Sequence, residues 1–260
     1  MTDSISRAYP EFDGKVVVVT GGSAGIGRAI ASAFAHNGAK VVVAGRDFEA
    51  ASRAVAEIER DAGAPALAVR TDVGVPAQCD ALIDAAVKHF GAVDILVNNA
   101  AYFALIPLLD VTAEDSARFL DVNFRGPLFC GRALARWAIA NQRPGVIVNV
   151  SSISGARPAP GCGLYSATKA ALNSLTKSMA LEWSPKGIRV NGVAPGHVDT
   201  EGVKEDFKTG RLDYQVMIRA IPARRIANVA DIADIVLFLG SDRSRHVAGA
   251  TVTIDGGESL

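Results

Sequence analysis

Tyr165 and Lys169 stand four residues apart in the stretch YSATKAALNSLTK, whose apolar residues recur at helical spacing. On a helix, positions i and i+4 share one face about one turn apart, so we expect the lysine ammonium to lie near the phenol. A phenol has a pKa near ~10, and a partly buried cation beside it lowers that pKa toward neutrality. Tyr165 would then donate a proton to a carbonyl oxygen in a reduction and accept one from an alcohol in an oxidation.

Ser151 and Ser152 end the apolar run GVIVNVSS, and Ser152 precedes Tyr165 by 13 residues. A hydroxyl at this place would hydrogen-bond the same substrate oxygen and stabilise the charge that develops on it. The run by itself leaves both serines open as the candidate.

The glycine-rich stretch TGGSAGIG, residues 20–27, follows the apolar run VVVV and precedes a helical pattern. Its G-x-S-x-G spacing matches the nucleophile elbow of serine hydrolases, with Ser23 as the nucleophile. That elbow needs earlier strands and an oxyanion loop, and here only one strand precedes it. The stretch also lacks the lysine of a Walker motif, because Arg28 stands in that place.

A cradle for a dinucleotide fits the same stretch better than a nucleophile does. Gly21 permits a tight turn out of the strand, Gly25 lets the backbone approach a pyrophosphate, and Gly27 lets the helix pack closely. The hydrolase stays open as an alternative, which treatment with a serine-reactive phosphonate would test.

Short β-branched runs alternate along the chain with longer stretches at helical spacing. The expected strands are residues 15–20, 40–45, 66–70, 93–99, 145–152, 188–196 and 250–257, and the expected helices are residues 26–38, 48–63, 76–91, 113–139, 165–183 and 229–241. This alternation predicts an α/β protein with one doubly wound, parallel, seven-stranded sheet of the Rossmann-like type, in a single domain spanning residues 1–260. Ligands of such sheets bind at the carboxyl ends of the strands, where the loops TGGSAGIG, DVG, NNAA, VSSISG and APGHVDT all fall.

Residues 197–227 match no strand and contain the charged run EGVKEDFKTGRLDYQ. A long excursion at the ligand edge of a sheet is often a lid, so we expect this segment to cover the substrate. A plain surface helix is the alternative.

Lysine plus arginine and aspartate plus glutamate each total 27, which gives a formal net charge of zero. We therefore expect no nucleic-acid partner and no membrane surface as a partner. The polar start MTDSISRAYPEFD lacks the apolar core of a signal peptide, and three widely spaced cysteines do not suggest a disulfide framework, so we expect a cytoplasmic protein. Isolated histidines and the lack of a C-x-x-C motif predict no metal site.

The spacing TGxxxGIG, the NNA after the fourth strand and the Tyr165-x-x-x-Lys169 pair after Ser152 together resemble the short-chain dehydrogenase/reductase family, in its 3-oxoacyl-ACP-reductase-like branch. The resemblance covers the chain from about Phe12 to Gly257. It implies hydride transfer between NAD(P) and a small-molecule ketone or secondary alcohol, in a homotetramer or dimer. A non-catalytic dinucleotide sensor or scaffold on the same fold is the alternative, and a missing tyrosine or lysine would be its expected sign.

The resemblance also implies roles for single residues. It selects Ser152 over Ser151 by the offset to Tyr165, and it implies that Asn123 positions Lys169 through a water and extends a proton relay. The alternative for Asn123 is a bond to its own helix backbone. A positive nicotinamide would add to the effect of Lys169 on the tyrosine. The implied cofactor contacts are Gly21, Ser23, Gly25, Ile26, Gly27, Asp72, Val73, Asn99, Ala100, Tyr165, Lys169, Pro195, Gly196, Val198 and Thr200.

The tip of the second strand decides between NAD and NADP. Relatives that use NAD carry an acidic residue there, which binds the 2′-hydroxyl, whereas this chain has Gly45 followed by Arg46. A guanidinium pairs well with a 2′-phosphate, so we expect NADP(H) to be preferred over NAD(H), with Arg46 as a contact. Ala24, where many NADP-preferring relatives carry a basic residue, and the neighbouring Asp47 weigh against this preference.

Two positions near the substrate depart from the pattern or stand out in it. Ala101 replaces the last glycine of NNAG, which would cost on the order of 1 kcal/mol only if the backbone there has positive φ. Arg157 is the one charged group in the loop SGARPAPGCGL and could bind an anionic substrate, although a solvated surface role is the alternative. The sequence does not identify the substrate.

Overall fold

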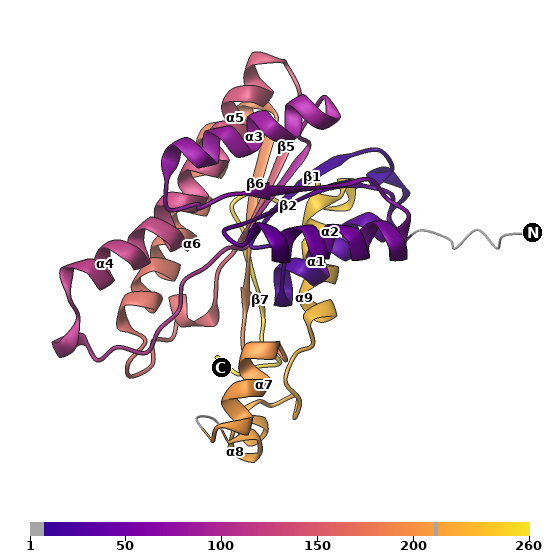
Figure 1. Ribbon diagram of the computed structural model, residues 1–260. Helices are drawn as coiled ribbons and strands as arrows, with labels where there is room; N and C mark the ends of the chain where they lie inside the picture. The colour runs from indigo at the N-terminus through magenta and orange to yellow at the C-terminus, as the bar shows by residue number, and fades with distance from the viewer. Residues whose placement is uncertain (1–7, 211–212) are drawn as a thin grey trace, which may run out of the picture.

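The computed structural model describes residues 8–210 and 213–260, so residues 1–7 of the predicted domain and 211–212 of the predicted lid lie outside the described part. Seven parallel strands form one sheet in the order β3-β2-β1-β4-β5-β6-β7 (Figure 1). Their bounds are β1 Val16–Thr20, β2 Lys40–Gly45, β3 Ala66–Arg70, β4 Ile95–Asn98, β5 Gly145–Val150, β6 Ile188–Pro195 and β7 Thr251–Ile254. The predicted seven-stranded, Rossmann-like sheet is confirmed, and each strand begins within two residues of its expected start.

Helices cover both faces of the sheet. They are α1 Gly25–His36, α2 Phe48–Ala62, α3 Pro76–Phe90, α4 Ala113–Leu120, α5 Gly126–Ala140, α6 Gly163–Trp183, α7 Glu201–Lys208, α8 Tyr214–Ala220 and α9 Val229–Gly240. One core joins Val17 and Val19 to α1, α2 and α9, and the other joins Val16 and Val18 to α3, α5 and α6. Successive strand residues point to opposite faces, so a strand that is apolar throughout needs helices on both sides.

The region 113–139, expected to be one helix, is three elements. Helix α4 passes into a π-helical turn, Asp121–Arg125, and then into α5. Pro127 in the first turn of α5 has no N–H to donate to the carbonyl four residues earlier, which disfavours a continuous α-helix there. The π-helical turn places Asn123 in the interior, where it is fully buried.

The segment 197–227 contains the short helices α7 and α8, which project at one end of the molecule beyond β7 (Figure 1). Thr200 accepts a hydrogen bond from Val203 N at 3.4 Å at the start of α7, and Asp213 accepts from two amides at the start of α8. A parallel bridge between Val198 and Ala227 closes the base of the segment.

Within the described ranges, every helix is too short or too polar to cross a bilayer. In the same part of the chain, histidine, cysteine, aspartate and glutamate side chains form no group of three or more with the geometry to hold a metal ion.

Candidate active site

The loops that follow β1, β4, β5 and β6 share one edge of the sheet, because these parallel strands are adjacent. The chain reverses its direction of travel across the sheet between β1 and β4. A reversal of this kind is the topological switch point at which open α/β sheets bind ligands.

The glycine-rich loop after β1 is held by residues at the end of β4. Thr20 Oγ1 accepts from the amides of Asn99 and Ala100 at 3.0 and 3.1 Å. The Asn99 side-chain amide donates to the carbonyls of Thr20 and Gly21 at 3.0 and 3.1 Å. The loop and the β4 terminus therefore form one hydrogen-bonded unit, and the donors of the Asn99 side chain are occupied within the protein.

Two of the predicted glycine roles are visible in this unit. Gly21 has φ of +64°, a backbone conformation that side-chain-bearing residues rarely adopt, as its turn requires. A Cβ on Gly27 would overlap the Gly21 carbonyl oxygen and the Asn99 amide, so Gly27 permits the start of α1 to approach the loop. Gly25, at φ of +53°, remains a predicted pyrophosphate contact, and so does the partly buried Ile26 beside it.

Ser23 and the tip of β2 lie together. A Cβ on Gly45 would lie 3.6 Å from Ser23 Oγ. Arg46 is exposed and makes no hydrogen bond or ion pair to any residue that the structure describes. The neighbouring Asp47 forms no ion pair with Arg46 in the described chain, and its carboxylate caps α2 by accepting from Ala50 N at 2.9 Å.

In the DVG loop after β3, Asp72 is partly exposed and Val73 is buried. The Asp72 carboxylate accepts from Gly74 N at 2.9 Å and is otherwise free to meet a ligand from its half-exposed position. Val73 is 7% exposed and packs against Gly126 of α5. Its side chain belongs to the core, so only its backbone remains as the predicted cofactor contact.

Ser152, Tyr165 and Lys169 come together between the end of β5 and the first turns of α6. Lys169 Nζ donates to the Val150 carbonyl at 2.8 Å, and its nitrogen lies 5.5 Å from the centre of the Tyr165 ring. Ser152 Oγ accepts from Ser154 N at 3.1 Å, and of the two serines it is Ser152 whose hydroxyl acts to lower the pKa of Tyr165. Ser151 instead is buried and donates to the Lys169 carbonyl at 3.3 Å.

Burial dominates the acidity of both groups. It raises the pKa of Tyr165 to about 12 and lowers the pKa of Lys169 to about 8. The predicted fall of the tyrosine pKa toward neutrality joined the Lys169 ammonium with a positive nicotinamide, and it remains a prediction. Desolvation outweighs the hydrogen bond from Ser152, and the lysine's own charge is destabilised in the same interior.

Asn123 links the active-site helix to the loop after β4. Its side chain accepts from Tyr102 N at 2.7 Å and donates to Tyr102 O at 2.9 Å and to Thr168 Oγ1 at 3.2 Å. The alternative of a bond to its own helix backbone is not what the structure shows. The predicted water-mediated link to Lys169, the next residue after Thr168, remains a prediction.

The loop after β6 is fastened to the C-terminal segment. Pro195 ends the strand, and a Cβ on Gly196 would meet Glu258 and Asp255 at 2.6 and 2.8 Å. His197 Nδ1 lies 2.5 Å from Glu258 Oε1. The last two predicted contacts differ in exposure, since Val198 is 4% exposed and Thr200 is half-exposed at the start of α7.

Arg157 and Ala101 are the two positions of the substrate side that the sequence singled out. The Arg157 guanidinium donates to the Glu258 carbonyl, so one of its faces is used within the protein. The positive-φ residues other than glycine in the described chain are Gln142 and Arg224, so Ala101 carries no strain.

Sequence reasoning missed two groups of residues under the site. Thr20 organises the glycine-rich loop, and a buried chain runs from Asn98 to Asn149 and on to Thr176, each step 2.9 Å. Asparagines inside otherwise apolar strands were the available signal, because a buried amide requires partners.

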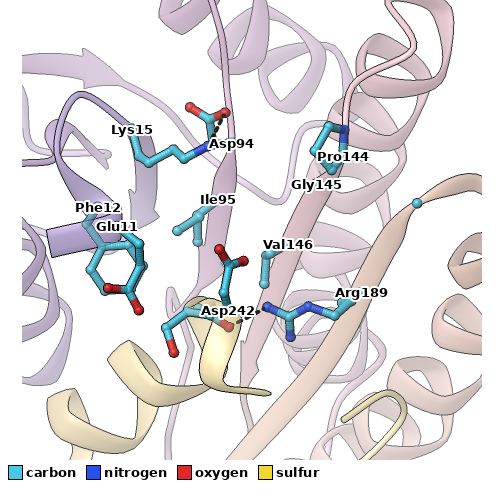
Figure 2. A pocket seen from close by; sticks show the side chains of 13 residues that line it. Glu11, Phe12, Lys15, Asp94, Ile95, Pro144, Gly145, Val146, Arg189 and Asp242 are labelled. Carbon is cyan, nitrogen blue, oxygen red and sulfur yellow. Dashed lines mark hydrogen bonds and ion pairs between the residues drawn. The ribbon is translucent and has the colours of Figure 1, made fainter. Parts of the chain in front are cut away.

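A cavity of about 250 Å³ lies at the opposite end of the sheet (Figure 2). Lys15, Asp94 and Gly145, which line it, stand at the amino ends of β1, β4 and β5. Asp94 there accepts from Val16 N at 2.9 Å and pairs with Lys15 and Arg143. Its charged groups hold the strand starts together, and the cavity is separate from the candidate active site.

The residues at the carboxyl edge fit a nicotinamide dinucleotide. At Gly25, with φ of +53°, a Cβ would meet only Thr200, at 3.6 Å, so the backbone amides at the start of α1 are open to a ligand. Ser23, Gly25 and Ile26 would hold the pyrophosphate, Asp72 the adenine, and Arg46 the ribose end, while Tyr165 and Lys169 would meet the nicotinamide ribose side.

Comparisons with known proteins identify the family and its fold. Residues 21–259 match a family described as enoyl-(acyl carrier protein) reductase. Sorbitol dehydrogenase of Cereibacter sphaeroides is 38% identical over 257 residues, which cover 94% of this chain and 97% of that protein. A solved NAD⁺-bound xylitol dehydrogenase is 31% identical, with a TM-score of 0.88 over 95% of this chain and 100% of that chain.

A solved 7α-hydroxysteroid dehydrogenase, complexed with NADH and 7-oxo glycochenodeoxycholic acid, is 35% identical, with a TM-score of 0.89 over 95% of this chain and 94% of that one. These relatives act at a C–OH or C=O centre, and the similarity spans nearly the whole chain. The chain belongs to the short-chain dehydrogenase/reductase family of oxidoreductases, as its motifs predicted.

Proposed function

We propose that the protein is an NADP(H)-dependent oxidoreductase that transfers a hydride between the nicotinamide and a ketone or secondary alcohol, with Tyr165 as the general acid and base. The observation that carries the proposal is the meeting of Ser152, Tyr165 and Lys169 at the same edge of the sheet as the glycine-rich loop. The intact tyrosine and lysine do not favour the sensor alternative, and membership of the family removes the serine hydrolase.

The residues act on the substrate oxygen. With a pKa of about 12, Tyr165 holds its proton at neutral pH and is ready to donate it to a carbonyl oxygen. The Ser152 hydroxyl binds the same oxygen and stabilises its developing charge. Lys169 orients the nicotinamide ribose and holds a proton behind the tyrosine, with Asn123 positioning it through a water. The dinucleotide, when bound, supplies or accepts the hydride and brings a positive ring that favours the phenolate in oxidation.

The preference for NADP(H) rests on the tip of β2. Arg46 is exposed and unpaired within the described chain, Asp47 is occupied as a helix cap, and Gly45 supplies no carboxylate to bind a 2′-hydroxyl. The solved relatives above carry NAD⁺ and NADH, so the preference rests on this chain's own residues.

Steady-state kinetics with NADPH and NADH test this preference. We expect wild type to favour NADPH, and Arg46→Ser to lower kcat/KM for NADPH by roughly 10- to 100-fold, because a charge-assisted bond to the phosphate is lost. The value for NADH should stay the same. Arg53→Ser, in the second turn of α2, is the matched control and should change kcat/KM for neither nucleotide. A wild-type preference for NADH contradicts the proposal.

We also propose that residues 197–227 close over the substrate and that the chain forms a homo-oligomer through α4, α5 and α6. Leu181 on α6 is 80% exposed, as expected of an apolar side chain that a second copy covers. Analytical ultracentrifugation of wild type and Leu181→Ser tests the assembly, since an interface of this kind would be weakened by the serine.

A further inference from the structure

The loop after β4 exposes large apolar side chains beside the catalytic tyrosine. Phe103, Leu105 and Leu108 are 54%, 63% and 68% exposed. Contiguous exposed apolar side chains on a folded protein commonly mark a place where something apolar binds.

These side chains lie along the segment that leads into Tyr165. The Phe103 ring meets the Tyr165 ring edge-on, with 5.0 Å between their centres. Leu105 lies against Gly161, Leu108 lies against Gly163, and the Ile106 amide donates to the Gly161 carbonyl at 2.8 Å. The apolar loop and the loop after β5 therefore form one wall that is continuous with the reacting centre.

The side chains of this wall carry few polar groups, and two charged or titratable groups near it have partners within the protein. The stretch AYFALIPLL, residues 101–109, has no charged or amide side chain, and its one hydroxyl belongs to Tyr102, whose ring packs against Phe119 and under Arg118. Arg157, the one charged group of the neighbouring loop, donates to the Glu258 carbonyl. His197 pairs with the same glutamate's carboxylate.

A site that selects a polyol needs polar side chains aimed at several hydroxyls, because binding leaves each unpaired hydroxyl desolvated. This wall offers hydrocarbon instead. We infer that the substrate is a ketone or secondary alcohol with a hydrocarbon body, such as an alicyclic ketone, and not a sugar or polyol. The inference rests on the proposed oxidoreductase function and names the substrate class of the same site.

The test uses NADPH and compares two ketones of matched size, 4-methylcyclohexanone and 4-hydroxycyclohexanone. The polyol ketone D-fructose is the third substrate. We expect kcat/KM for the methyl compound to exceed that for the hydroxyl compound by about tenfold or more, and D-fructose to be the poorest substrate. Equal or better use of 4-hydroxycyclohexanone or D-fructose overturns the inference.

Two variants tie the preference to the wall. Leu105→Ser and Leu108→Ser should raise KM for 4-methylcyclohexanone several-fold, leave kcat nearly unchanged and reduce the methyl-over-hydroxyl ratio. Phe238→Ser is the control, because Phe238 is 36% exposed on α9, two residues before Gly240, which lines the cavity at the opposite end of the sheet. If the loop variants change the sedimentation coefficient and not KM, the patch is a contact between subunits and the inference fails.

A binding measurement separates this inference from the proposed chemistry. 2-Decalone and D-fructose are titrated into the Tyr165→Phe variant with NADPH, following nucleotide fluorescence. Saturable binding of 2-decalone but not D-fructose supports the apolar site even if wild type reduces no ketone, in which case only the proposed reaction fails. No binding of 2-decalone overturns the inference.

Discussion

The glycine-rich loop after β1 and the helices α7 and α8 both belong to the carboxyl edge of the sheet, but they are held in different ways. The loop is fixed by Thr20 and Asn99, whose hydrogen bonds join residues 78 to 80 positions apart in the chain. Helices α7 and α8 are capped by the neighbouring Thr200 and Asp213, and the ion pair of Lys204 with Asp199 is also local.

This contrast indicates that the two regions have different functions. Long-range bonds between strands fix the geometry that a constant ligand, the dinucleotide, requires. Local contacts leave the substrate side free to vary in position and sequence without disturbing the sheet. Substitutions in the two regions should therefore have different effects on nucleotide binding and on turnover.

The largest effect is expected from Tyr165→Phe, which removes the proton donor and leaves the ring. We expect kcat to fall by about 10²- to 10⁴-fold, because general acid catalysis is lost. The dissociation constant for NADPH, measured by fluorescence, should change by less than about threefold. Retention of most of the turnover would assign the proton transfer to another group.

Gly27→Ala, in contrast, should mainly weaken nucleotide binding. Its Cβ has no room against the Gly21 carbonyl and the Asn99 amide, so the loop must shift, and we expect NADPH binding to weaken by at least about tenfold, with a lower Tm. Gly202→Ala in α7 is the matched control, since its Cβ would meet only Thr200 Oγ1, at 4.0 Å. Equal behaviour of the two variants would refute the contrast between the regions.

Lys169 lies beside Tyr165 and is also a predicted nucleotide contact. Its burial should affect the pH dependence of stability. Its pKa falls from 10.5 to about 8 on folding, so between these values the unfolded chain binds a proton that the folded chain lacks. The free energy of unfolding therefore rises with pH between about pH 8 and 10.5. Relative to Lys169→Met, we expect the wild-type free energy of unfolding to increase by roughly 2 kcal/mol from pH 7.5 to 10 in urea titrations. A constant difference between the two proteins would show that the lysine titrates normally.

The smallest effect is expected from Arg157→Ala, which loosens the bond to the Glu258 carbonyl at the rim of the substrate side. A few-fold loss of kcat/KM should appear equally on acidic and neutral ketones, because the contact is structural. A loss confined to acidic ketones would instead assign anion recognition to this arginine.

The sheet and the meeting of Tyr165 with Lys169 could be predicted from the sequence because both depend on local pattern, whereas the choice of Ser152 over Ser151 came from the family resemblance. Apolar β-branched runs specify buried strands, and the four-residue spacing of Tyr165 and Lys169 specifies a shared helix face. The acidity of these two groups could not be predicted, because it depends on how deeply the fold buries them. The contacts of Asn123 and Glu258 depend on which loops meet, information that spacing does not carry.

The π-helical turn Asp121–Arg125 has a consequence for the length of the chain. A π-turn holds one residue more than the α-helical turn it replaces, and one residue corresponds to a rotation of about 100° about the helix axis. Deleting Val122 would therefore rotate α4 by about 100° about the helix axis relative to α5. Natural insertions and deletions should be rarer at this turn than in α7 or α8, whose caps are made by neighbouring residues.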